Sequence, residues 1–124
     1  ELKLAPAAGT IERYRLQEWL SFLSTELHKG FAPLFNPTAT DAFKETVVEK
    51  LKRRFGWMDR QLEGRDFLMG SQFTVADAYG FTVASWTDRM KIDRSSMSHL
   101  GDYVERVAAR PCVETAMRAE GLLD

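Results

Sequence analysis

The sequence predicts an all-α domain of about five helices arranged around a buried, N-capped central helix. Apolar residues recur at steps of three and four in several segments, whereas the alternation that is typical of strands is essentially absent. A helix-capping sequence directly precedes the most apolar segment of the chain. With 124 residues, the chain is long enough to bury a core, and we treat 10–124 as one helical domain.

The first predicted helix runs from about Thr10, its N-cap, to Phe31. Gly30 and Pro33 are expected to kink or end this helix, and a turn-rich loop follows at 36–40. Apolar residues at three- and four-residue steps form one stripe, which is predicted to face the core: Leu16, Leu20, Leu23, Leu27, Phe31 and Leu34.

The second predicted helix begins near Asp41 and ends around Glu63 and Gly64, where glycine can adopt the left-handed C-terminal cap. Because strand alternation is essentially absent, we expect these two long helices to be antiparallel and to pack with a buried central one. Its inward stripe is predicted to comprise six residues: Phe43, Val47, Leu51, Phe55, Met58 and Leu62.

The third predicted helix, from Thr74 to about Met90, is the central one. Thr74 and Asp77 have the spacing of a capping box, in which each side chain accepts a hydrogen bond from the other residue's backbone N–H. The segment from Ala78 to Trp86 is apolar on nearly every side, so this helix should be buried all round. We interpret Thr74 and Asp77 as structural residues and expect Asp77→Ala to destabilise the fold by about 1 to 3 kcal/mol.

Two shorter helices are predicted to complete the domain. The fourth runs from about Ser96 or Ser98 to Ala109, with Leu100, Tyr103, Val104 and Val107 turned inward. Pro111 is well placed to begin the last helix, which continues through Ala119 and ends at Gly121.

Composition restricts the function classes. Seventeen basic and eighteen acidic residues leave a net charge of −1, and no basic block favours a nucleic-acid or anionic-membrane partner. No apolar run has the length of a membrane span, and no signal peptide is evident. The single cysteine, Cys112, excludes an internal disulfide and is typical of a reducing compartment, so we expect a cytoplasmic protein. The stretch 1–9 contains Pro and Gly and is predicted to be a linker or the tail of an upstream unit.

A polar line on the first helix is the best candidate for chemistry. Ser21, Thr25 and His28 are spaced to share one helix face beside the leucine stripe. Two hydroxyls and an imidazole can bind a small polar ligand, and histidine can titrate near neutral pH. Periodicity alone, however, favours an ordinary solvated helix face.

Motifs along almost the whole chain resemble one family. The run Thr-Glu-Leu-His-Lys-Gly-Phe at 25–31, with Glu-Trp-Leu before it and Pro-Leu-Phe after it, resembles the first helix of the C-terminal domain in bacterial beta-class glutathione transferases. The cap at 73–79, the Arg-Pro pair at 110–111 and the ending at 118–122 are similar to the same domain. The resemblance implies the glutathione-transferase C-terminal helical bundle as the fold.

The resemblance also implies site residues and no metal. The family's histidine corresponds to His28, where an imidazole beside the glutathione sulfur would favour the thiolate. Phe31, Leu34 and Trp86 would contribute to the apolar pocket for the second substrate, whereas Tyr79 is expected in the core. The glutathione-binding positions that the resemblance implies are Ser21, Thr25, Glu26, Leu27, His28 and Lys29. At the position of Ser21, relatives have asparagine.

A two-domain enzyme is the function that the resemblance implies. A thioredoxin-like N-terminal domain would supply most of the glutathione site and a cysteine, and the full-length protein would be a homodimer that conjugates or reduces small electrophiles. The helical domain alone would be inactive, and Cys112 is expected to be partly buried and without a role. The alternative is a non-catalytic glutathione-transferase-like binding or scaffolding module.

Overall fold

The structure is a computed structural model that describes residues 3–123, so the first two residues of the predicted linker and the last residue lie outside it. The described residues form five α-helices and two further helical segments, and their one β-type pairing is an isolated bridge between Phe67 and Gly70. The all-α prediction is therefore confirmed. The elements in chain order are α1 (Ile11–Phe22), η1 (Leu23–His28), η2 (Lys29–Phe35), α2 (Asp41–Gln61), α3 (Val75–Arg89), α4 (Ser98–Ala108) and α5 (Pro111–Ala119).

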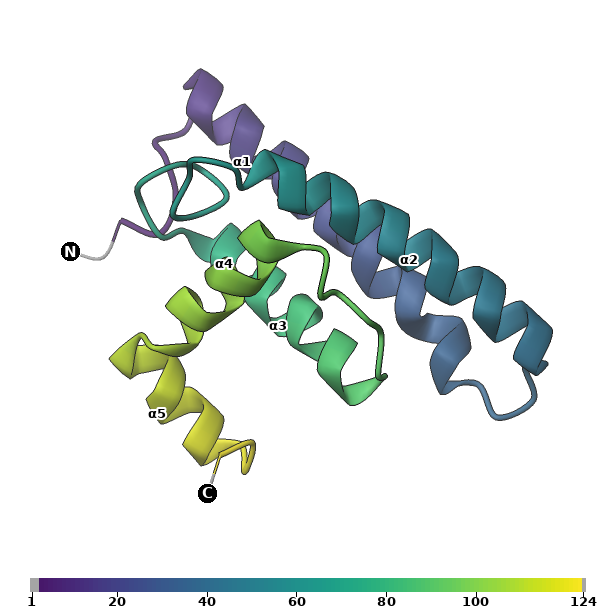
Figure 1. The fold of residues 1–124 in the computed structure, drawn as a ribbon. Helices are drawn as coiled ribbons and strands as arrows, with labels where there is room; N and C mark the ends of the chain where they lie inside the picture. The colour runs from purple at the N-terminus through teal and green to yellow at the C-terminus, as the bar shows by residue number, and fades with distance from the viewer. Residues whose placement is uncertain (1–2, 124) are drawn as a thin grey trace.

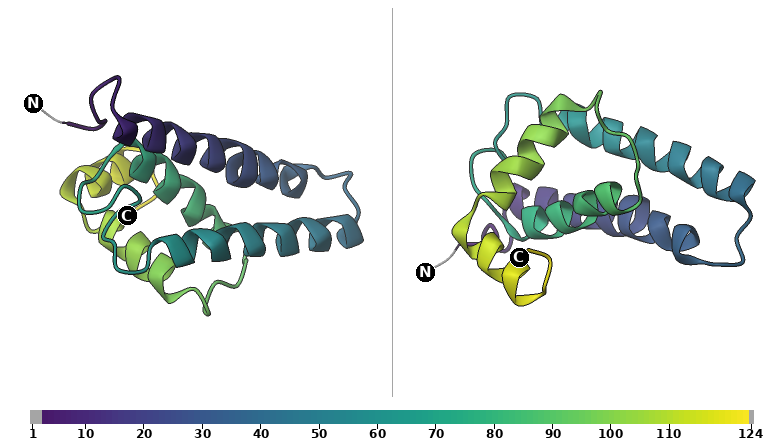
Figure 2. Two further views of the ribbon diagram at one scale, coloured as in Figure 1. Left: turned by 90° about the horizontal axis from the view of Figure 1, so that it is seen from above. Right: turned by 60° about the horizontal axis from the view of Figure 1, so that its bottom comes forward.

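The first three segments form one continuous rod that lies antiparallel to α2 (Figures 1 and 2). Thr10 caps the rod by accepting a hydrogen bond from the Arg13 amide at 3.2 Å. The predicted end near Phe31 is wrong, because the chain passes from α-helix to π-helix at Leu23 and then to 3-10 helix, which carries it through Pro33 to Phe35.

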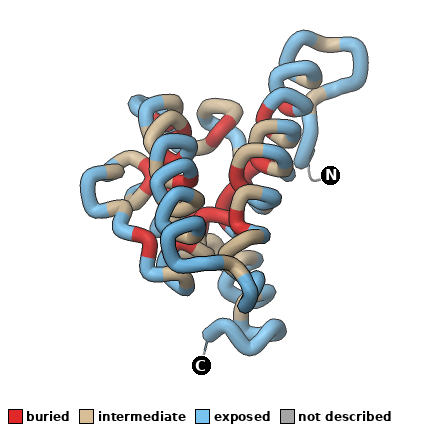
Figure 3. Tube along the Cα trace, turned by 90° about the vertical axis from the view of Figure 1, so that its right-hand side faces the viewer, coloured by how far each residue is buried: buried red, intermediate tan, exposed pale blue. Residues whose placement is uncertain are grey.

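The inward stripe of the rod continues through the π-helical segment. Leu23, Leu27 and Phe31 follow one another at four-residue steps and all have 0% exposure. Leu23 and Leu27 lie in the π-helix and Phe31 lies in the 3-10 helix that follows, so one buried side continues through both segments. Leu20 and Leu34 are half-buried and pack against this core at its edge. Figure 3 shows the buried positions concentrated where the helices face one another.

The helix α2 covers the second side of the core. Leu51, Phe55 and Met58 are buried as predicted, and Gly64 has the positive φ that ends the following turn. Phe43, predicted to face the core, is 52% exposed. The first turns of α2 extend with the end of the rod beyond α3, α4 and α5 (Figure 2), so none of these described helices covers them.

The helix α3 lies between the rod and α4 and contacts both (Figure 1). Its inward residues, including Ala76, Gly80, Val83 and Ala84, are buried. The prediction that α3 is buried all round is wrong, because a stripe along one side is exposed. That stripe contains Val75, Ala78, Thr82 and Arg89.

The N-terminus of α3 is held by a buried carboxylate. Asp77 is 0% exposed, and its Oδ2 accepts the Thr74 amide at 2.8 Å, while the Thr74 hydroxyl accepts the Ala76 amide at 3.3 Å. Both halves of the capping box are present. The Asp77 Oδ1 atom also accepts the Leu68 amide at 2.9 Å and the Tyr103 hydroxyl at 3.1 Å. This buried centre, comprising Leu68, Thr74, Asp77 and Tyr103, joins the preceding loop, α3 and α4.

Burial has a clear electrostatic effect in this centre. Removal from water raises the pKa of the Asp77 carboxyl, although its hydrogen bonds from Leu68, Thr74 and Tyr103 oppose the rise. Burial, together with the nearby Asp77, raises the pKa of the Tyr103 phenol far above its ordinary value. Tyr103 therefore keeps its proton and remains a donor to the carboxylate.

The last two helices agree closely with their predicted bounds. Leu100, Tyr103 and Val107 of α4 are buried, and the Leu100 amide near the start of this helix donates to the Asp59 carboxylate of α2 at 2.8 Å. Pro111 begins α5 as predicted, and no residue of this fully described helix is buried. Between residues 3 and 123, none of the helices combines the length and the apolar character needed to cross a bilayer.

The described part of the N-terminal segment is bound to the helical body. The Leu4 carbonyl accepts the Val75 amide at 2.9 Å, at the first residue of α3. The Lys3 carbonyl accepts from the Gln72 side chain at 2.9 Å, and the Pro6 carbonyl accepts from Arg13 at 2.7 Å. This segment therefore has a fixed course across the start of α3.

Candidate functional site

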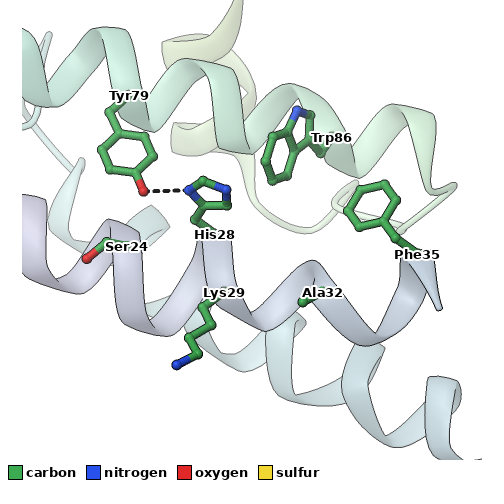
Figure 4. Close-up of a pocket in the computed structure, with 7 residues that line it drawn as sticks. All are labelled: Ser24, His28, Lys29, Ala32, Phe35, Tyr79 and Trp86. Atoms are coloured by element: carbon green, nitrogen blue, oxygen red, sulfur yellow. Dashed lines mark hydrogen bonds between the residues drawn. The ribbon is translucent and has the colours of Figure 1, made fainter. Parts of the chain in front are cut away.

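A pocket of about 380 Å³ lies between the rod and α3. The rod contributes polar side chains from 24 to 29 and apolar side chains from 32 to 35. The helix α3 contributes two aromatic side chains that point toward the rod (Figure 4). Its volume falls within the range of small-molecule sites. The residues that line it are Ser24, His28, Lys29, Ala32, Phe35, Tyr79 and Trp86.

The His28 imidazole is the polar centre of this pocket. Its Nδ1 lies 2.6 Å from the Tyr79 hydroxyl oxygen (Figure 4). Its ring meets those of Tyr79 and Trp86 nearly edge-on, with centroid distances of 5.6 and 5.1 Å. His28 is exposed and does not turn into the hydrophobic interior. The imidazole is therefore oriented by α3 and accessible to a ligand.

The structure separates the predicted polar line. Ser24, His28 and Ala32 recur at four-residue steps along the pocket, whereas Thr25 and Glu26 line a different groove, beside α2. Straight α-helical spacing placed Ser21, Thr25 and His28 on one face, but the π-helix from Leu23 to His28 changes the rotation per residue. The π-helical hydrogen bond from the Lys29 amide to the Ser24 carbonyl marks this change.

The predicted glutathione-binding residues have different surroundings. The Thr25 hydroxyl donates to the Ser21 carbonyl at 2.8 Å, and Glu26 forms an ion pair with Arg54 of α2 at 2.9 Å. The side chain of Leu27 is fully buried, so it can offer a ligand only its backbone. Ser21 is exposed, and Lys29 lines the pocket although its side chain points away from His28 in Figure 4.

The predicted apolar residues agree with the pocket only in part. Trp86 lines it, whereas Phe31 is 0% exposed and packs against Trp86 at a centroid distance of 5.4 Å. Phe31 and Leu34 belong to the inward stripe of the rod, which contributes to the core instead of the pocket surface. Phe35, one residue further on, is 54% exposed and lines the pocket with Trp86.

The sequence interpretation missed four lining residues. Tyr79 was expected in the core but is half-buried and reaches His28. Its spacing from Trp86, two turns of helix, indicates that both project from the same side of α3. Ser24 and Ala32 lie four residues before and after His28, and this spacing likewise indicates a shared side of the rod. Helical periodicity does not predict that Phe35 lines the pocket.

Two other side chains with reactive groups, Cys112 and His99, lie outside the pocket. Cys112 is exposed at the start of α5, so the expectation of a partly buried thiol is wrong. His99 of α4 lines a separate, polar depression. Within the part of the chain that the structure describes, there is no group of three side chains that could hold a metal ion.

Comparisons with known proteins agree on one family. A family profile described as the C-terminal domain of glutathione S-transferase matches residues 22–111. Glutathione S-transferase GstA of Escherichia coli O157:H7 is 40% identical over 119 residues, which are 96% of this chain and 59% of GstA.

Two solved structures extend the likeness to three dimensions. A glutathione S-transferase of a sphingomonad, solved in complex with glutathione, has 42% identity and a TM-score of 0.90. The bacterial beta-class glutathione S-transferase of Sphingomonas chungbukensis has 44% identity and a TM-score of 0.91. In both comparisons the match covers 97% of this chain and 60% of the other.

The extent and the identity of these matches decide the family. The chain spans about three fifths of the length of the relatives that it matches, and the matched part is their helical C-terminal domain. The fold built around α3 and the motif that contains His28 agree with this assignment. The chain belongs to the glutathione S-transferase C-terminal domain family and is close to the bacterial beta-class enzymes.

Proposed function

We propose that this chain is the helical half of a glutathione transferase that conjugates or reduces small electrophiles with glutathione. It would contribute one wall of the glutathione site and part of the apolar substrate pocket. The observation that carries the proposal is an exposed imidazole, His28, held by Tyr79 inside a pocket of ligand size. The solved relative with bound glutathione supports the choice of co-substrate.

The chemistry of the proposed site follows from the residues around His28. A thiol reacts as its thiolate, and an imidazole beside the sulfur would stabilise that form. Trp86 and Phe35 provide an aromatic surface for an apolar electrophile next to the imidazole. Holding the thiolate and the electrophile together would lower the entropic part of the barrier.

Binding of glutathione would involve the polar residues of the rod in addition to His28. Ser21, Thr25 and Lys29 are exposed, and Lys29 could pair with a carboxylate of the tripeptide. Glu26 is committed to Arg54 in this structure, so its participation would require that ion pair to open or to be shared. Leu27 could contribute only its backbone groups to glutathione binding, because its side chain is buried.

The proposed enzyme includes a second domain. The relatives are longer than this chain, and we propose that a thioredoxin-like domain precedes residue 10, with 1–9 as the linker. That domain would supply a cysteine and most of the glutathione site, so 10–124 alone would be inactive. We also propose that the full-length protein is a homodimer. The single unpaired cysteine supports a reducing compartment, and we propose the cytoplasm.

The test compares the two histidines of the chain in the longer polypeptide. We expect His28→Ala to lower turnover of a small electrophile with glutathione by about tenfold or more, because it removes the group beside the sulfur. His99→Ala is the matched control, since His99 lies in α4 outside the pocket, and it should leave turnover unchanged. Initial rates over a range of glutathione concentrations measure both effects.

Two outcomes would overturn the proposal. If turnover and glutathione affinity are the same in His28→Ala and His99→Ala, His28 has no place in the site. If a thioredoxin-like half restores no activity to the unsubstituted chain, the non-catalytic binding or scaffolding module becomes the better description.

A further inference from the structure

We propose that Tyr79 is a positioning residue that sets the tautomer of His28. Its hydroxyl donates to Nδ1, so the proton of the neutral imidazole resides on Nε2. The bond itself is independent of glutathione. Its consequence for turnover rests on the proposed function above.

The length of the bond favours Tyr79 as the donor. The two atoms are 2.6 Å apart, which is shorter than usual for an N–H donor and within the range for an O–H donor. Neutral imidazole has one donor and one acceptor nitrogen, so acceptance at Nδ1 assigns the proton to Nε2. Figure 4 shows the second ring nitrogen on the side away from Tyr79.

The position of Tyr79 is well defined by its helix. Asp77, two residues earlier, is held by the buried centre, and Gly80, the next residue, lies against α4 and the preceding loop. A Cβ at Gly80 would lie 3.0 Å from Leu68 Cδ1 and 3.1 Å from the Tyr103 hydroxyl oxygen. This close packing fixes the first turns of α3 and therefore the place from which Tyr79 reaches His28.

A second aromatic ring of α3 also restrains the imidazole. Trp86 meets the His28 ring at an interplanar angle of 78°, and Phe31 and Phe35 pack on Trp86 nearly perpendicular to it. A half-turn of the ring about the Cβ–Cγ bond would put Cδ2 in the place of Nδ1 and would break the bond to Tyr79. One orientation is therefore preferred.

A fixed Nε2–H gives His28 a specific task in the proposed site. It can donate a hydrogen bond to a thiolate sulfur, whereas the other tautomer would present a lone pair to that negative charge. His28 would thus stabilise the thiolate as a donor, and Tyr79 would act only through it. The contribution of Tyr79 should appear in turnover more than in the affinity for glutathione.

The first experiment reads the tautomer directly by nuclear magnetic resonance. In the chain labelled with 15N at histidine, the nitrogen shifts and couplings to the ring protons should identify Nε2–H in neutral His28. Tyr79→Phe should shift this pattern toward a mixture of tautomers, while His99 in the same spectrum stays unchanged. Tyr14→Phe is the matched control, because Tyr14 is 63% exposed on α1 and outside the pocket.

Either of two spectra would overturn the inference: Nδ1–H in the unsubstituted chain, or the same His28 pattern in Tyr79→Phe and Tyr14→Phe. The second experiment measures turnover in the longer polypeptide. There, Tyr79→Phe should lower kcat roughly threefold to tenfold, the loss of one hydrogen bond, with KM for glutathione unchanged.

The two proposals fail separately. If the tautomer changes as expected but His28→Ala leaves turnover intact, the positioning bond stands and the proposed function falls. If His28→Ala removes activity but Tyr79→Phe changes neither tautomer nor kcat, the proposed function stands and the role of Tyr79 falls.

Discussion

Two regions of the molecule join a tyrosine hydroxyl to an ionisable side chain, and both depend on α3. In the buried centre, Asp77 is 0% exposed and accepts hydrogen bonds from Leu68, Thr74 and Tyr103. In the pocket, the exposed His28 is bonded to Tyr79. Several buried donors hold the Asp77 carboxylate in one arrangement, whereas the exposed His28 ring uses one nitrogen for Tyr79 and has a second nitrogen for a ligand. The difference separates a site for stability from a site for binding.

The buried centre and the pocket lie on different sides of the same helix, α3. Asp77 and Tyr79 are two residues apart, so they project from different sides of the helix. Asp77 points to the loop and α4, and Tyr79 points to the rod. A substitution in the buried centre should therefore lower folding stability, and one in the pocket should change ligand chemistry.

The largest expected effect is the loss of stability in Asp77→Ala. The substitution leaves the backbone N–H groups of Leu68 and Thr74 and the Tyr103 hydroxyl without their acceptor in a buried region. We expect the free energy of unfolding to fall by about 3 kcal/mol or more, from the lost cap and the unsatisfied donors together. Urea unfolding followed by circular dichroism measures this change.

Asp102→Ala is the matched control for that measurement. Asp102 is exposed on α4, and its replacement should change the free energy of unfolding by no more than about 0.5 kcal/mol. Equal effects of the two substitutions would mean that the buried centre is not what holds α3 in place.

A smaller effect is expected from Tyr103→Phe. The aromatic ring stays in the core, and Asp77 Oδ1 retains the Leu68 amide. The loss is that of one hydroxyl donor, which is shared between the Oδ1 atom and the backbone carbonyl of Asp77. We expect the free energy of unfolding to fall by about 1 kcal/mol. Unfolding by urea at neutral pH provides the value, and an unchanged stability would remove the hydroxyl from the list of stabilising groups.

Local patterns were sufficient to predict the buried centre in part. The Thr74 and Asp77 spacing predicted the cap, because a capping box involves residues only three apart. The bonds from Tyr103 to Asp77 and from Leu100 to Asp59 could not be predicted, since they join residues far apart in the sequence. Such contacts depend on how the helices pack, which periodicity does not specify.

The pocket was harder to predict than the core. His28 was identified by resemblance to a family motif, but its neighbours were assigned on the assumption of regular α-helix. The π-helix from Leu23 to His28 brought Ser24 to His28 in place of Thr25. Phe43 is a related case, because an apolar stripe does not reveal how far the neighbouring helices extend.

The pH dependence of stability should distinguish the buried centre further. Burial raises the pKa of Asp77 above its ordinary value of 3.8, so the folded chain keeps this proton at pH values where the unfolded chain has lost it. The contribution of this carboxyl to stability is fully present at pH values below its ordinary pKa, and it is lost as the pH rises through its pKa in the folded chain. The asparagine of Asp77→Asn cannot titrate. As the pH rises from the ordinary pKa of Asp77 to its raised value in the folded chain, the unsubstituted chain should lose stability and the variant should not, so the difference in their free energies of unfolding should narrow. Urea unfolding at a series of pH values measures the difference, and one that is constant or widens with pH would contradict the expectation.

The smallest expected change in stability is that of Tyr79→Phe, which, like Tyr103→Phe, removes one tyrosine hydroxyl, here from α3. Tyr79 is half-buried at the edge of the pocket, where water can replace its bond to His28. We expect the free energy of unfolding to change by less than about 0.5 kcal/mol while the nitrogen shifts of His28 change. Urea unfolding and the histidine spectrum, recorded on one sample, measure the two together. If Tyr79→Phe destabilised the chain as much as Tyr103→Phe, the pocket would be part of what supports the core, and folding stability and ligand binding could not be assigned to separate sides of α3.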